Sequence, residues 1–141
     1  MQTILTIQTK GAGFTEITRQ AQDFVSGAAG EGTDGLLTLF VRHTSCSLVI
    51  QENADPDVRR DLDAFFRRLA PPANDASMGY LVHRLEGPDD MPAHIKAALL
   101  PVSLSVPAAQ GRLLLGRWQG IFLWEHRDCP HRREVALHFA G

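Results

Sequence analysis

The hydrophobic positions along the chain follow two patterns, one that alternates and one that repeats at helical spacing. Short segments that alternate, or that are rich in β-branched and aromatic residues, predict strands because successive strand side chains point to opposite faces. Segments such as KGAG, GAAGEGTDG and PAAQG predict turns between several of them. The predicted strands cover residues 2–9, 35–43, 45–51, 80–85, 103–106, 112–116, 121–127 and 133–140.

Helical spacing predicts three helices. The first covers residues 15–26, and the third begins in the segment DDMPAHIKAALL with Asp89 or Asp90 as its N-cap. The second, in ADPDVRRDLDAFFRRLAPP, has the strongest pattern, because Asp55 can cap it, Pro56 fits its first turn and two prolines end it. Its apolar positions form a stripe that we expect to be buried: Val58, Leu62, Phe65, Phe66 and Leu69.

The order of these elements indicates the fold class. The predicted strands come in groups and do not alternate with helices, which favours an α+β fold with mainly antiparallel sheets over a doubly wound parallel sheet. The sequence shows no repeat and no linker-like boundary. We therefore expect one domain over residues 1–141.

Composition narrows the classes of partner. The formal net charge is −2 and the isoelectric point is about 6.3, so no global field attracts nucleic acid or an anionic membrane surface. Two cysteines are too few for a secreted disulfide scaffold of this size. No apolar run approaches the roughly 18 residues of a membrane span, and the N-terminal segment resembles a strand more than a signal peptide. We expect a cytoplasmic protein with neither nucleic-acid nor membrane partners.

Polar residues interrupt the predicted strands near HTSCS. If the chain stays extended there, His43, Ser45 and Ser47 share one face, while Cys46 lies on the other as a small buried residue. The polar row fits a ligand site in which His43 acts as a base or metal ligand. It fits a solvated sheet face equally well, and the spacing does not decide between the two.

Carboxylates follow directly after this segment. Asp55 and Asp57 are explained as a helix cap and as a partner of the helix dipole. No periodicity explains Glu52 and Asn53 in the preceding turn. They are therefore better candidates for a functional site.

The segment HRLEGPDDMPAH holds a second polar cluster. Two histidines, His83 and His94, lie close in the chain to Glu86, Asp89 and Asp90. Imidazole and carboxylate ligands suit zinc or another transition ion, although the spacing matches no established metal motif. Single histidines are more often structural, so this hypothesis needs further support. A third histidine from elsewhere would complete the site, and His43 is the natural choice.

The segment GRLLLGRWQGIFLWEHR adds candidates near a pocket edge. Trp118 and Gln119 lie between glycines that often mark bulges or close backbone approach. Alternation places Glu125 on the same strand face as Leu123, where a buried carboxylate requires a partner. Arg127 or Arg112 is the expected partner.

Four segments together resemble the YjbQ family, also called UPF0047, and the match runs from about residue 36 to the C-terminus. They are HTSCSLVIQENADPDVRRDL, EGPDDMPAHIK, GRLLLGRWQGIFLWEHR and HRREVALHFAG. The resemblance implies β sheets packed as a sandwich with about three helices, a homotrimer, and a polar pocket at or near a subunit interface whose histidines hold a metal. It maps the family motifs onto these residues: His43, Thr44, Ser45, Glu52, Asn53, Asp55, His83, Glu86, Asp89, Asp90, His94, Lys96, Trp118, Gln119 and Gly120.

Some members of that family carry the name secondary thiamine-phosphate synthase. That reaction joins a pyrimidine diphosphate to a thiazole phosphate and expels pyrophosphate, so it needs a divalent ion and basic groups at the leaving group. Asp89 or Asp90 could hold Mg²⁺, with Lys96, Arg112 or Arg127 at the departing charge. Histidine ligands favour zinc instead.

The leading hypothesis is therefore a small enzyme with a His/acid metal pocket and thiamine-phosphate synthase-type activity on a small phosphorylated molecule. One alternative is metal-assisted hydrolysis of a phosphate ester or amide, with Glu52 or Asp90 as base. Another is a protein that binds a metal or ligand without catalysis. The expected roles are as follows: metal ligands His43, His83 and His94; catalytic groups Glu52, Asn53, Asp89 and Asp90; substrate-binding groups Ser45, Ser47, Lys96, Arg112, Trp118 and Gln119.

Overall fold

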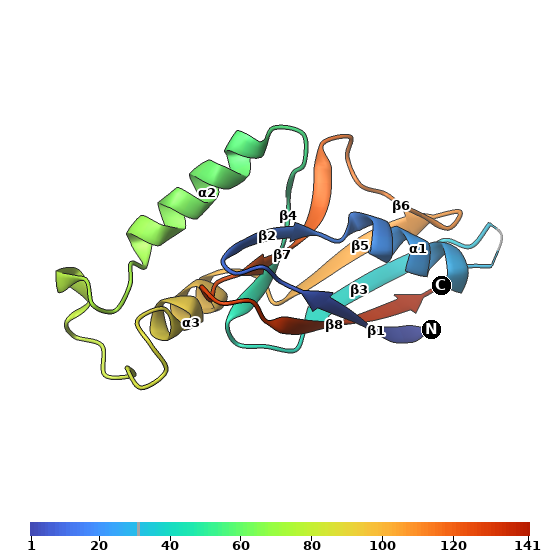
Figure 1. The fold of residues 1–141 in the computed structure, drawn as a ribbon. Helices are drawn as coiled ribbons and strands as arrows, with labels where there is room; N and C mark the ends of the chain where they lie inside the picture. Colours follow the sequence, from blue (N-terminus) through green and yellow to red (C-terminus); the bar gives the residue numbers. More distant parts are fainter. Residues whose placement is uncertain (31) are drawn as a thin grey trace.

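A computed structural model describes residues 1–30 and 32–141. Residue 31, in the predicted glycine-rich connection, lies outside the described residues. The described chain has eight strands, three α-helices and one 3-10 turn, η1 (Figure 1). In chain order they are β1 Gln2–Gln8, β2 Gly13–Glu16, α1 Thr18–Ala28, β3 Gly35–Val41, β4 Cys46–Glu52, α2 Pro56–Leu69, η1 Ala76–Met78, α3 Asp90–Leu99, β5 Ser103–Ala109, β6 Arg112–Leu113, β7 Gln119–Glu125 and β8 Arg132–Ala140.

Two antiparallel sheets enclose the main core, which confirms the predicted α+β class. The larger has the order β1-β8-β3-β5-β6 and the smaller has the order β2-β7-β4. Alternate residues of β3, Leu37, Leu39 and Val41, point inward and are fully or almost fully buried. They pack with inward residues of β4, β7 and β8 and with Ala21 and Val25 of α1. Helix α1 therefore closes the side of the core that the smaller sheet leaves open.

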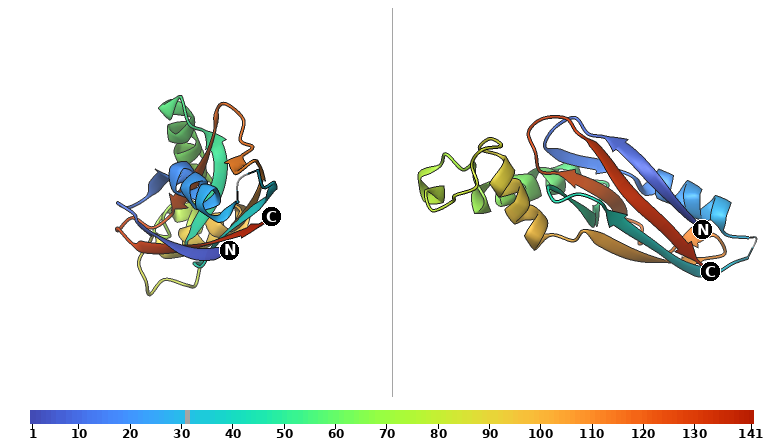
Figure 2. Two further views of the ribbon diagram at one scale, coloured as in Figure 1. Left: turned by 90° about the vertical axis from the view of Figure 1, so that its right-hand side faces the viewer. Right: turned by 90° about the horizontal axis from the view of Figure 1, so that it is seen from below.

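A second, smaller cluster lies on the outer face of the three-stranded sheet. Val49, Phe122 and Trp124 form it, and Leu62 and Phe66 of α2 pack against it. Trp124 contacts Phe66 edge to face with 5.1 Å between the ring centroids. Helix α2 and the segment before α3 lie at one end of the elongated molecule, opposite α1 and both chain ends (Figure 2).

Helix α2 is amphipathic as predicted, but its stripe is less buried than expected. Asp55 caps the helix, because its Oδ1 accepts a hydrogen bond from the Asp57 amide at 2.9 Å. Leu62 and Phe66 are half-buried, whereas the side chains of Phe65 and Leu69 are exposed. The stripe is wider than the surface that the sheet offers, so only part of it finds partners within the chain.

Three local predictions about strands are corrected by the structure. Residues 80–85 form no strand. The first helix was predicted from residue 15, but it begins at Thr18, because β2 extends to Glu16 and pairs with β7. Residues 42–45 are not extended, since β3 ends at Val41 and β4 begins at Cys46. The polar row expected from continuous alternation between residues 43 and 47 is therefore broken by this connection.

A buried ion pair occupies the end of the core. Glu125 is fully buried and accepts hydrogen bonds from the Arg133 side chain, from the Thr9 hydroxyl at 2.8 Å and from the Arg127 amide at 3.2 Å. Its side-chain cation is Arg133, not the expected Arg127 or Arg112. Alternation along β8 places Arg133 on the inward face with Val135, which satisfies the charge of Glu125 within the core.

A search of the described helices finds none with the length and apolar character needed to cross a membrane.

Candidate metal centre and an adjoining pocket

The start of α3 brings two donors to one face of the helix. Asp90 and His94 are four residues apart, a spacing that stacks side chains on the same helix face. His94 Nε2 lies 3.1 Å from Asp90 Oδ2. His83, from the segment before α3, places its Nε2 2.7 Å from the same oxygen. The donor atoms of these three residues all lie within 4.8 Å of one another.

Asp90 is held from its other side by Arg127. Arg127 Nη1 donates to Asp90 Oδ1 at 2.8 Å, and its Nε donates to Asp89 Oδ2 at 2.8 Å. Its Nη2 donates to the Glu86 carbonyl oxygen at 3.0 Å. Arg127 thereby joins the end of β7 to the start of α3 and leaves Asp90 Oδ2 directed at the two imidazoles.

The hydrogen bonds of His94 determine which of its nitrogens is protonated. His94 Nδ1 lies 3.0 Å from the Thr44 carbonyl oxygen, which can only accept, so we assign the proton to Nδ1. In a neutral ring Nε2 then presents a lone pair toward Asp90 Oδ2. Two acceptors at this distance require a hydrogen or a metal ion between them. Imidazole nitrogen and carboxylate oxygen are the donors that zinc prefers.

The pKa values of both aspartates are lowered. Burial by itself raises the pKa of Asp90, but its hydrogen bond with His83 and the charge of Arg127 lower the pKa overall. For Asp89, burial again raises the pKa, and the hydrogen bonds from Arg127 and from the Asp128 amide lower it below its ordinary value. Both carboxylates are therefore anionic at neutral pH.

His43, the expected third imidazole ligand, does not join this group. Its Nε2 accepts a hydrogen bond from the Glu134 amide at 2.8 Å, which uses its lone pair on β8. Burial, followed by the charge of Arg133, lowers the pKa of His43. Within the described residues, the donors that converge are His83, Asp90 and His94.

The two serines of the HTSCS segment contact structural partners. Ser45 Oγ accepts a hydrogen bond from Arg133 Nη2 at 2.9 Å. Ser47 Oγ lies 2.9 Å from His126 Nε2, and Ser47 is fully buried. As expected, Cys46 is buried, and burial raises the pKa of its thiol to about 12.

Glu52, Asn53, Trp118 and Gln119 form a separate group at the far end of the small sheet. Glu52 pairs with Gln119 at one end of the β4–β7 ladder, and Cys46 pairs with Glu125 at the other. A strand of this length spans roughly 20 Å. The Asn53 amide donates to the Trp118 carbonyl oxygen at 3.0 Å. Within one chain, this group therefore cannot share a substrate atom with His94.

The basic residues expected around the metal lie elsewhere. Arg112 is exposed on β6. Lys96 lies two residues beyond His94, and a helix turns by about 200° over that interval. Lys96 consequently points to the opposite side of α3, where Pro92 and Asp89 line a small pocket with it.

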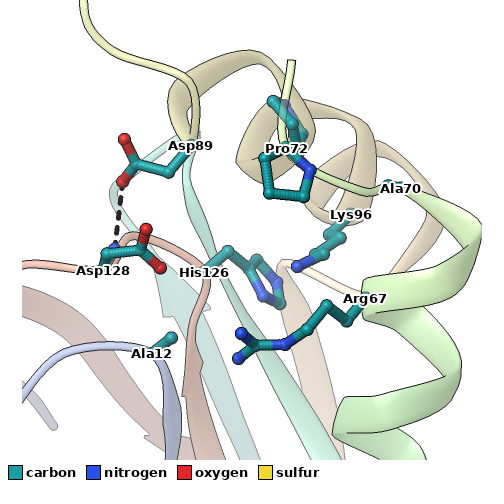
Figure 3. Close-up of a pocket in the computed structure, with 9 residues that line it drawn as sticks. Ala12, Arg67, Ala70, Pro72, Asp89, Lys96, His126 and Asp128 are labelled. Carbon is teal, nitrogen blue, oxygen red and sulfur yellow. Dashed lines mark hydrogen bonds between the residues drawn. The ribbon is translucent and has the colours of Figure 1, made fainter. Parts of the chain in front are cut away.

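This pocket contains two residues that sequence reasoning did not assign to a site. Arg67 at the end of α2 and Lys96 point toward His126, at the end of β7 (Figure 3). Burial lowers the pKa of His126 to about 3, and the charge of Lys96 is the second cause. Alternation places His126 on the same strand face as Trp124, which gives a sequence signal for its burial. No comparable signal indicates Arg67, because its position depends on how α2 docks.

Comparisons with a family model and with known proteins give matches over almost the full length of the chain. The model of the family described as UPF0047 protein YjbQ-like matches residues 3–141. UPF0047 protein sll1880 from Synechocystis is 51% identical over 99% of this chain and 91% of its own. UPF0047 protein YjbQ from Salmonella typhimurium is 47% identical over 99% of this chain and 97% of its own.

Solved structures give the same result for the fold. The crystal structure of the conserved hypothetical protein TT1486 from Thermus thermophilus matches with a TM-score of 0.82 and 40% identity, over 98% of this chain and 99% of that chain. A YjbQ/UPF0047-family structure from Clostridium acetobutylicum matches with a TM-score of 0.84 and 32% identity, over the same shares.

Proposed function

Because the chain belongs to the YjbQ-like UPF0047 family, we propose a function that starts from its candidate metal centre: His83, Asp90 and His94 bind a divalent metal ion, zinc in preference to magnesium. The observation that supports this proposal is the convergence of two imidazole nitrogens on Asp90 Oδ2, at 2.7 and 3.1 Å. Magnesium prefers oxygen ligands, so a site with two nitrogen donors favours zinc.

The donor set resembles a catalytic site more than a structural one. Structural zinc sites have four protein ligands, whereas catalytic sites have three and leave a position for substrate. A bound divalent ion would supply Lewis-acid polarisation of a phosphoryl or carbonyl oxygen. The Thr44 carbonyl oxygen orients His94, and Arg127 orients Asp90, as outer residues commonly do around metal ligands. Glu86, whose carboxylate lies 4.0 Å from His83 Nε2, is assigned to proton transfer.

Metal analysis of His94→Ala tests the binding site. The variant should lose the ion that co-purifies with the wild-type protein expressed without an affinity tag, while its circular dichroism spectrum stays unchanged. His131→Ala is the matched control, because His131 is also a partly exposed histidine but bonds the Cys129 carbonyl oxygen. Equal metal content in wild type and His94→Ala would contradict the proposal.

We further propose that the centre acts on a small phosphorylated molecule. Thiamine-phosphate formation is the reaction that the family resemblance suggests, and it requires cations at the departing pyrophosphate. Arg127 is already paired with two aspartates, Lys96 faces away from His94 and Arg112 is exposed on β6. This distribution favours the second candidate, hydrolysis of a small phosphate ester or amide, which has no pyrophosphate to hold.

Two assays on the zinc-loaded protein distinguish these reactions. One measures thiamine phosphate formed from the pyrimidine diphosphate and the thiazole phosphate, and the other measures phosphate released from a panel of monoesters and phosphoramides. Whichever activity is found should disappear in His94→Ala and fall in Glu86→Gln. If the wild-type protein binds zinc and shows neither activity, the binding protein without catalysis is the correct hypothesis.

We also propose that the chain forms a homotrimer in the cytoplasm. Val82 and Leu85, which flank His83 and its neighbour Arg84, are 94% and 101% exposed. Large apolar side chains gathered near a polar site commonly mark an interface, and a second copy of the chain would cover them beside the metal centre. Both cysteines are free thiols, which suits a reducing compartment.

A further inference from the structure

The pocket on the opposite side of α3 has the features of a built binding site. It lies between α2, α3 and the end of β7, and its cavity volume is about 60 Å³. A cavity of that size holds a few water molecules or one small polyatomic ion, and is well below the several hundred Å³ of sites for drug-sized ligands. His126, Lys96 and Arg67 meet there (Figure 3).

His126 lines this region, and one of its two ring nitrogens is unused. The residue is only 3% exposed, and its Nδ1 is buried without a hydrogen-bond partner among the described residues. Such an atom costs free energy unless a ligand or water satisfies it. The buried Nδ1 is therefore an observation that points to an occupant.

The neighbouring serine indicates that this atom is a donor. The Ser47 hydroxyl is fully buried, and in the described part of the chain its hydrogen-bond partner is His126 Nε2, at 2.9 Å. If Nε2 were protonated, the hydroxyl hydrogen of Ser47 would have no acceptor. The hydroxyl therefore donates to Nε2, and the neutral ring carries its own proton on Nδ1. An occupant whose acceptor atom reaches Nδ1 would receive that hydrogen.

Two cations face the same space. Lys96 has no hydrogen bond or ion pair with any described residue, and Arg67 has only an exposed contact of 3.3 Å with Asp63, four residues earlier on α2. Of the pocket carboxylates, Asp89 is already paired with Arg127 and the Asp128 amide. Among the described residues no hydrogen bond engages the Asp128 carboxylate, so it can accept one from a hydroxyl group of the occupant.

We propose that this pocket binds a small oxyanion, either phosphate or the phosphoryl end of a small phosphomonoester, through Lys96, Arg67 and the Nδ1–H of His126. The site goes beyond the proposed metal centre, because Lys96 and His94 lie on opposite sides of α3. An N–H donor from a neutral ring and two side-chain cations favour a tetrahedral oxyanion over a spherical anion such as chloride.

Isothermal titration calorimetry with inorganic phosphate and with glycerol phosphate tests the proposal, in a buffer free of other oxyanions and with sodium chloride as the comparison. We expect saturable binding of at least one of the two, and tighter binding of glycerol phosphate identifies a monoester site. Lys96→Met, which keeps the apolar stem, and Arg67→Gln should each weaken binding about tenfold or more. Ser47→Ala should also weaken it, because the protonation of His126 is no longer fixed.

Two controls separate this proposal from the metal proposal and from general surface charge. Arg60→Gln, on the exposed part of α2, should bind as the wild type does. His94→Ala should keep oxyanion binding even if it loses metal, and Lys96→Met should keep its metal. Absence of phosphate binding at millimolar concentration overturns the proposal, as does equal binding by wild type, Lys96→Met and Arg67→Gln.

Discussion

His126 is a buried neutral imidazole, and its burial makes stability depend on pH. The pKa of His126 is about 3 in the folded chain and about 6.5 when exposed. Between these values the unfolded chain binds a proton that the folded chain does not, so the free energy of unfolding falls as pH falls. From pH 6.5 to about pH 4.5, where carboxylates begin to titrate, we expect a loss of about 2 kcal/mol.

Urea denaturation across that pH range measures this effect, and His126→Gln should largely remove the slope while it preserves a hydrogen bond to Ser47. A smaller slope should remain, because burial also lowers the pKa of His43. An identical slope in wild type and variant would show that the buried imidazole is not its source.

The clustering of residues in the candidate metal centre could be predicted where the chain itself brings them together. His83, Asp90 and His94 lie in one short segment, and the helix repeat aligns two of them, so local sequence was enough. His43 was chosen only as a third histidine from elsewhere in the chain, and its contact with the Glu134 amide depends on the fold. Arg67 was missed because its place in the pocket follows from the docking of α2, which no local pattern encodes.

Helix α2 depends on its N-cap more than most helices, because few of its side chains are buried. Asp55→Ala removes the acceptor for the Asp57 amide and should lower the free energy of unfolding by about 1 kcal/mol. Asp55→Asn keeps an acceptor for this amide, so it should lower the free energy of unfolding by only a few tenths of that amount. The urea midpoint should shift without a change in slope. Equal effects of the two substitutions would mean that Asp55 stabilises the helix through its charge and not through the hydrogen bond of the cap.

Elements with regular patterns were predicted well, and the misses share a cause. Alternation located β1, β3, β4, β5, β7 and β8 to within a few residues. Residues 80–85 are also rich in apolar side chains, but a strand requires a neighbour to pair with, and pairing is a property of the fold. β2 was missed for the converse reason, since four residues that begin with glycine give little pattern, yet β7 supplies a partner.

At the scale of the molecule, exposed apolar residues predict that stability depends on protein concentration. If copies associate through Val82 and Leu85, the melting temperature should rise with concentration, since assembly stabilises the folded state by mass action. Light scattering should give three times the chain mass of 15.5 kDa. Val82→Asp combined with Leu85→Asp should yield a monomer whose melting temperature is independent of concentration.

Leu114→Asp is the matched control, because Leu114 is also exposed, at 60%, but lies near the β5–β6 hairpin. A wild-type protein of single-chain mass at all concentrations would contradict the proposed trimer. Dissociation by Leu114→Asp would place the interface on a different face.

The three donors of the metal centre come from residues 83–94, so they stay near one another even when the chain is unfolded. If these residues bind a divalent ion, the denatured chain would retain part of that affinity, although the contacts of His94 with Thr44 and of Asp90 with Arg127 are lost. Only the difference in affinity between the folded and unfolded chains adds to stability. The ion would therefore stabilise the folded state by less than the affinity of the folded chain suggests. If the candidate centre binds metal, rapid capture during synthesis would be the compensating advantage, because the ligands can meet before β7 and β8 exist.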